Sequence, residues 1–68
     1  MSNIVRVVLE ECVSYWMIRA EIETGYAIQV ADRKQQDVAK EVAFEWCQKY
    51  GFTEYQTITM AEKRSQLR

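Results

Sequence analysis

The side chains that could do chemistry in this 68-residue chain are two cysteines and ten carboxylates, with no histidine beside them. Because histidine is the usual general base near neutral pH, its absence removes the Ser-His and Cys-His pairs that activate a nucleophile. Cys12 follows two glutamates and Cys47 lies near the C-terminal end of an expected helix, so a thiolate is disfavoured at both positions. Two such cysteines without a CxxC motif are typical of a cytoplasmic protein with reduced, structural or incidental thiols.

The carboxylates include three close pairs in the sequence. General acid–base catalysis would need one pair desolvated in a cleft, and a domain of this size has little room for one. The spacing shows no calcium-binding loop, and two glycines cannot build a phosphate-binding loop. We therefore expect no enzymatic activity, no cofactor and no metal ion. The pairs are Glu10/Glu11, Glu21/Glu23 and Glu41/Glu45.

Composition and charge indicate one small domain. A net charge of −1 argues against the general affinity for nucleic acid that an excess of Lys and Arg gives. No apolar run approaches the length of about 18 residues of a membrane span, and no leader peptide is visible, so we expect no membrane partner. A domain this small is marginally stable alone. Its hydrophobic content of 49%, with eight aromatic residues, therefore favours a homodimer.

The length and the lack of catalytic groups are also those of small accessory proteins. These include phage or mobile-element products that block a host protein. This hypothesis comes from what short reading frames commonly encode and from no particular residue of the chain.

Alternation of apolar and polar residues predicts three strands ahead of the only long helix. The strands cover residues 4–11, 15–22 and 26–30. In each strand one set of alternate residues is mainly apolar, which assigns it to the core face of the sheet. The other set of the first two strands mixes apolar and charged residues, as expected for a face that is exposed to water or covered by a partner.

The connection between the second and third strands can be predicted from the direction of the side chains. A three-residue loop ending at Gly25 sets Ile22 opposite Tyr26 and keeps one face of the hairpin apolar. The same register sets Ile18 opposite Val30. It also places Gly25 at the left-handed position that closes a three-residue hairpin loop. A slip by one residue would mix the two faces.

Residues 32–51 are predicted to form the helix that covers the apolar face of the sheet. Asp32 is the predicted N-cap, with Gln35 placed to close a capping box. Gly51 suits the left-handed position that follows the last turn. Arg33 and Lys34 would then lie in the first turn, where the helix dipole disfavours positive charge.

One stripe of this helix is apolar and is expected to face the sheet. It contains Val38, Val42 and Trp46, flanked by Ala39, Ala43 and Tyr50. Phe44 projects to the opposite side. It is either a lone exposed aromatic residue or a contact for another chain.

Residues 52–60 are predicted to form a fourth strand at an edge of the sheet, parallel to the first strand and placed beside it in the order 4-1-2-3. Residues 1–3 are expected to be a frayed lead, and residues 61–68 a polar, basic tail or a short helix. The predicted fold is thus a single α+β domain of order β-β-β-α-β. Its expected core contains Val5, Val7, Leu9, Trp16, Ile18, Ile22, Tyr26, Ile28, Val38, Val42, Trp46 and Ile58.

The face of the sheet away from the helix is the candidate binding surface, because one helix covers only one side. Tyr, Met and Arg are favoured in interfaces, so we expect self-association or binding of another protein here. The candidate contacts are Arg6, Val8, Tyr15, Met17, Arg19 and Gln29, with Phe44 on the helix as a further candidate. The alternative is a weak single-strand nucleic-acid binder, in which Tyr15 stacks on a base and Arg6 and Arg19 meet phosphates.

Overall fold

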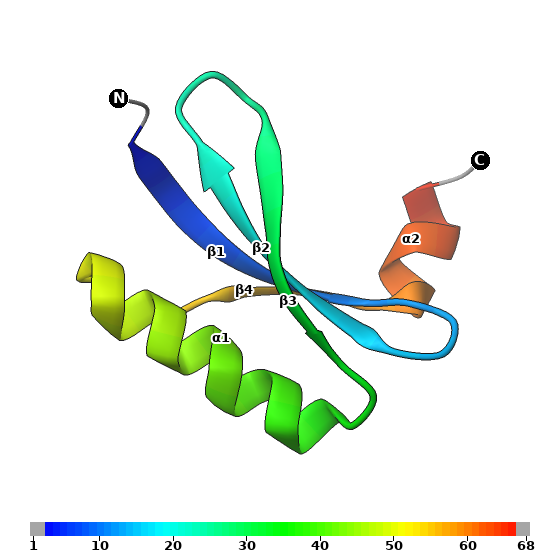
Figure 1. Cartoon of the computed structure of the whole chain (residues 1–68). Coiled ribbons are helices and arrows are strands. Elements are labelled where there is room, and N and C mark those ends of the chain that lie inside the picture. The colour runs from blue at the N-terminus through cyan, green and yellow to red at the C-terminus, as the bar shows by residue number, and fades with distance from the viewer. Residues whose placement is uncertain (1–2, 67–68) are drawn as a thin grey trace.

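The computed structural model describes residues 3–66, which form a four-stranded sheet and two helices (Figure 1). The strand order is β3-β2-β1-β4, with the first three strands antiparallel and β4 parallel to β1. The predicted α+β fold, with one helix on a meander and the fourth strand at an edge beside the first, is confirmed. The elements are β1 (Ile4–Glu11), β2 (Trp16–Ile22), β3 (Ala27–Arg33), α1 (Gln36–Tyr50), β4 (Gln56–Ile58) and α2 (Met60–Gln66).

The hairpin of β2 and β3 has the predicted register at its turn. The Ile22 N–H donates to the Tyr26 carbonyl at 2.9 Å, and Gly25 takes a positive φ of 95°. Further along, β3 has one extra residue, so Ala31 rather than Val30 faces Ile18, and the predicted Ile18–Val30 pair is wrong. A β-bulge of this kind bends an edge strand, and the sequence contains no turn residue at this position that would predict it.

The helix α1 begins three residues later than predicted, at Gln36 with Gln35 as its N-cap. Asp32 is not its N-cap, because β3 continues to Arg33 and pairs Asp32 with Met17. Gln35 holds the N-cap position without a side-chain hydrogen bond. The predicted end is confirmed, since Gly51 has a φ of 79° and its N–H donates to the Gln48 carbonyl.

The face that α1 turns to the sheet is rotated by one residue from the predicted stripe. Ala39, Ala43 and Cys47 are fully buried against the sheet. Val42 and Trp46 are only half-buried at the edge of this contact, and Val38 is exposed, so its predicted core position is wrong. Small side chains let a helix approach a sheet closely. The helix therefore turns its alanines and cysteine to the sheet, and the larger side chains are displaced to the flanks. On the sheet, this core contains Val7, Leu9 and Ile18.

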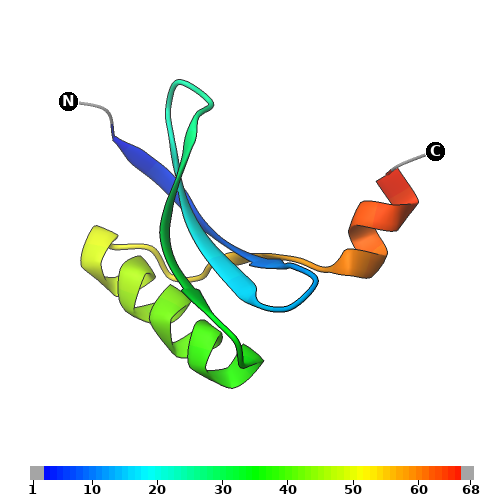
Figure 2. The ribbon, with the colours of Figure 1, turned by 45° about the vertical axis from the view of Figure 1, so that its right-hand side comes forward.

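The apolar face of the sheet extends beyond α1, and two predicted core residues are exposed for that reason. Tyr26 is 74% exposed and Ile28 is 54% exposed, although both lie on the α1 side of the sheet. Figure 2 shows the turn between β2 and β3 projecting beyond α1. Val5 is also exposed, because it is the extra residue of a bulge in β1 between Ile4 and Arg6.

After α1, the strand is shorter than predicted and more of the chain is helical than predicted. β4 contains three residues of the predicted segment 52–60, and Ile58 is half-buried. The helix α2 accounts for most of the segment predicted as a tail or a short helix, and the Thr59 hydroxyl accepts a hydrogen bond from the Glu62 N–H at 3.2 Å. Of the predicted lead, Asn3 accepts a hydrogen bond from the Glu23 N–H, while residues 1–2 and 67–68 lie outside the described residues.

Candidate functional site

The sheet face opposite α1 is the predicted binding surface, and charged side chains cover it. The alternation along β1 and β2 places Arg6, Glu10, Arg19 and Glu21 on this face together with Val8. Val8 is 0% exposed, so an apolar residue expected to meet a partner is fully enclosed within the domain. The surface that a partner would meet here is therefore made of ion pairs around one buried valine.

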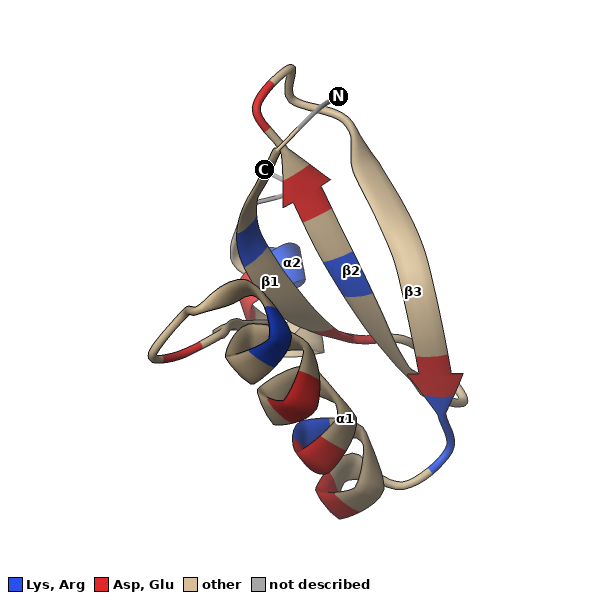
Figure 3. Cartoon of the chain, turned by 60° about the vertical axis from the view of Figure 1, so that its left-hand side comes forward, with Lys and Arg blue, Asp and Glu red and all other residues tan. Residues whose placement is uncertain are grey.

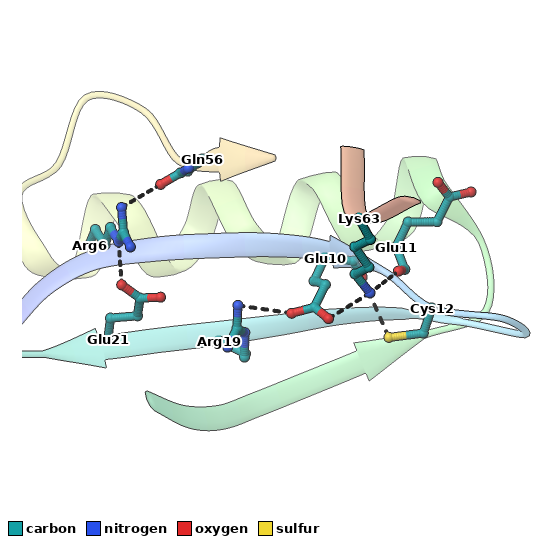
Figure 4. Close-up of polar contacts among 8 residues, drawn as sticks. All are labelled: Arg6, Glu10, Glu11, Cys12, Arg19, Glu21, Gln56 and Lys63. Carbon is teal, nitrogen blue, oxygen red and sulfur yellow. Dashed lines mark hydrogen bonds and ion pairs between the residues drawn. The ribbon is translucent and has the colours of Figure 1, made fainter. Parts of the chain in front are cut away.

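The larger group of ion pairs joins α2 to the sheet. One carboxylate oxygen of Glu10 lies 2.8 Å from Nη2 of Arg19, and the other lies 2.7 Å from Nζ of Lys63 (Figure 4). Nζ of Lys63 also donates to the Glu11 carbonyl at 2.7 Å, and the Met60 N–H donates to the Glu11 carboxylate at 2.9 Å. Two of the carboxylates that could have been catalytic candidates thus fix the position of a helix.

The smaller group joins three strands. Arg6 of β1 pairs with Glu21 of β2 and donates from Nη1 to Oε1 of Gln56 of β4 at 2.6 Å. Both arginines proposed for phosphate contacts are consequently paired with carboxylates, since Arg19 contacts Glu10. A nucleic-acid phosphate would have to displace a carboxylate at each position, and the interaction with single strands stays a prediction.

Of the remaining candidates, Met17 and Gln29 lie on the predicted face, because they pair with Glu10 and Arg19, whereas Phe44 does not. Tyr15 precedes β2 and is partly exposed, and the pKa of its phenol is raised, chiefly by a hydrogen bond with Cys12. Met17 is half-buried, and Gln29 of β3 is exposed and donates to the Asp32 carboxylate at 3.1 Å. Phe44 is exposed on α1, on the other side of the sheet, so it cannot share a flat interface with them.

Sequence reasoning missed an apolar exposed surface, because it assigned these residues to the core. We call this surface the hairpin overhang and define it as the exposed Tyr26 and Ile28 with the half-buried Ile22. Figure 3 shows the corresponding end of β2 and β3 standing clear of α1. A signal was present in the sequence: residues 24–31 contain no charged side chain, although β3 is at the edge of the sheet. Edge strands usually carry charge or proline that prevents pairing with other chains.

A shallow depression of about 220 Å³ on α1 offers little to a ligand. It is lined by Glu45, Trp46 and Lys49. The Lys49 ammonium lies 4.6 Å from the centre of the Trp46 ring, and Trp46 stacks on Tyr50 at 5.7 Å between ring centres. These contacts within one helix already occupy the polar and aromatic groups that a ligand would use.

The described residues also show no other chemical centre. Within residues 3–66, no three Cys, Asp or Glu side chains are grouped as metal ligands would be. Cys12 and Cys47 are free thiols, and burial raises the pKa of Cys47. Neither helix in this part of the chain is long and apolar enough to span a membrane.

No known protein family, curated protein sequence or solved structure matches the chain. What the protein does therefore has to be inferred from its residues and their geometry.

Proposed function

We propose that this chain is a non-enzymatic protein-binding module and that the hairpin overhang is its contact surface. The observation that supports the proposal most is the exposure of Tyr26 and Ile28 side by side at the end of an edge strand. Tyrosine is among the side chains that are enriched as anchors at the centre of protein interfaces. The overhang replaces the ion-paired face as the proposed centre of binding.

The distribution of the aromatic residues also supports a binding role. All eight lie within residues 3–66 and all keep some exposure, while the fully buried core contains nothing larger than Leu9 and Ile18. An aromatic side chain buries about 150–250 Å² when it is enclosed, which makes it a large contributor to folding or binding. Four of the eight are exposed and offer this area to a partner, whereas the other four already pack partly against the core, namely Trp16, Trp46, Phe52 and Tyr55.

The polar turn beside the overhang suits the rim of such an interface. Glu23 and Thr24 are exposed in the turn that joins Ile22 to Tyr26, while Arg6 and Gln29 project from the opposite face of the sheet. Interfaces commonly combine an apolar centre with a polar rim. The sequence-based contact residues Arg6 and Gln29 lie outside the proposed surface, and a role as a phage or mobile-element accessory protein stays a prediction.

The proposal is tested by protein capture from a lysate of the organism that encodes the chain, using immobilised wild type and matched variants. We expect Tyr26→Ser/Ile28→Ser to lose the proteins retained by the wild type, because the apolar anchors are removed. Val13→Ser is the control, since Val13 is 91% exposed in the turn between β1 and β2, away from the overhang. Retention of the same proteins by the double variant would refute the overhang as the contact surface.

A further inference from the structure

One side of β3 has no strand partner among residues 3–66, because β3 ends the sheet. The Tyr26 carbonyl accepts from the Ile22 N–H, so the backbone groups of Tyr26 point toward β2. These directions alternate along an antiparallel strand. The backbone N–H and C=O of Ile28 therefore also point toward β2, and those of Ala27 and Gln29 point outward, away from the sheet. The outer side of β3 thus presents two donors and two acceptors in the geometry of a strand.

The side chains of this strand do nothing to prevent pairing. From residue 24 to residue 31 there is neither charge nor proline, and the first charge along β3 is Asp32 (Figure 3). Lysine, proline or an inward-pointing charge is the usual protection of an exposed edge. A β-bulge is a further protection, and here it lies at Val30, beyond the outward-facing groups of Ala27 and Gln29.

We propose that β3 pairs antiparallel with β3 of a second copy about a two-fold axis at Ile28. This joins two four-stranded sheets into one sheet of eight strands. The inference rests on the proposed function and names a second copy of the chain as one protein that this end of the sheet binds. A strand added to an exposed edge gains affinity from main-chain hydrogen bonds and specificity from alternate side chains.

The sequence of β3 is self-complementary in this register. Ala27 of one copy lies opposite Gln29 of the other, so the outward backbone groups meet as two hydrogen-bonded pairs. Ile28 lies opposite its own copy, and Tyr26 lies opposite Val30, so the apolar side chains of both copies meet on one face. An axis at Gln29 would instead set Tyr26 opposite Asp32.

Charge at the two ends of the interface is compatible with the same axis. The turn that carries Glu23 comes to lie beside the end of β3 in the other copy, where Arg33 is exposed. The nearby Asp32 carboxylate already accepts a hydrogen bond from Gln29. Because the paired segment is short, the dimer belongs among small interfaces, and we expect it to be reversible at micromolar concentrations.

Disulfide cross-linking tests the axis directly, in a Cys12→Ser background that removes the partly exposed native thiol. Residues opposite each other in a non-hydrogen-bonded pair have Cα atoms about 4.5 Å apart, within disulfide range. We expect Ile28→Cys to form an interchain disulfide at least tenfold faster than Val13→Cys, a control for random collision. Gln29→Cys should not exceed that control, because the two Cα atoms would be roughly 8 Å apart. A slow Ile28→Cys, or a faster Gln29→Cys, would overturn the proposed pairing.

A proline variant tests the role of the backbone. Gln29→Pro removes an outward N–H and leaves the hydrogen bonds between β3 and β2 in place. In sedimentation experiments on the full chain, we expect its dimer dissociation constant to rise at least tenfold, while Gln29→Ala associates like the wild type. Equal association of the proline variant and the wild type would overturn the proposal.

The two proposals fail in different ways. A wild-type chain that is monomeric at all concentrations refutes the pairing of two copies, while capture that depends on Tyr26 and Ile28 would still support protein binding. If the Gln29→Pro variant still captures the proteins from the lysate but no longer dimerises, those proteins are bound by the side chains of the overhang. The second copy is then bound by the backbone groups of β3.

Discussion

Leu9→Ala is expected to lower the free energy of unfolding by about 3 kcal/mol, the usual cost of emptying a fully buried leucine site. Leu9 has no exposed surface and lies in the core between the sheet and α1. A domain of this length has a total stability of roughly 3–10 kcal/mol. One substitution should therefore remove a third or more of it, visible as a lower midpoint in urea unfolding.

Val5→Ala is the matched control for this experiment. It removes two methyl groups from the same strand, but at a position that is half exposed because of the bulge in β1. We expect it to cost less than about 1 kcal/mol. Equal losses for Val5→Ala and Leu9→Ala would show that the core is not between β1 and α1.

Glu10→Gln is expected to cost about 2 kcal/mol and to loosen α2, because one carboxylate holds two cations. The Glu10 side chain is 17% exposed and contacts both Arg19 and Lys63. A neutral amide would leave these two positive charges close together without a counter-charge. Partial solvent screening keeps the expected cost below the roughly 3–5 kcal/mol of a fully buried pair.

Glu21→Gln is the control, since it breaks the single pair with Arg6, whose side chain is half exposed. We expect a loss of under about 1 kcal/mol, as for surface pairs. Urea unfolding gives the free energies, and amide exchange in α2 reports the loosening. The account of the ion-paired face would be contradicted by an equal loss in both variants, or by unchanged exchange in α2.

Side-chain alternation predicted the first two strands well because it is a local property. The bounds of β1 and the register at the turn before Tyr26 follow from the alternation and from one glycine, and Gly51 marks the helix end. The start of α1 does not follow in this way. Asp32 has the chemistry of an N-cap, but the pairing of β3 with β2 continues past it and outweighs that local preference.

The candidate site could be predicted less well, because exposure depends on how far one element covers another. Tyr26 and Ile28 lie on the apolar face of the sheet as expected, and only the position of α1 leaves them exposed. Val8 shows the reverse. Its alternation placed it correctly on the charged face, yet the arrangement of the surrounding side chains there leaves it completely buried.

The pairing of β3 with a second copy is tested most directly by amide hydrogen exchange at Ala27 and Gln29, measured over a range of protein concentration. Both N–H groups point away from β2, so they should exchange quickly in a dilute monomer and become protected as the dimer forms. The Ile28 amide, which points toward β2, serves as the internal reference and should be protected throughout. Fast exchange at Ala27 and Gln29 at every concentration, beside a protected Ile28, would contradict the account.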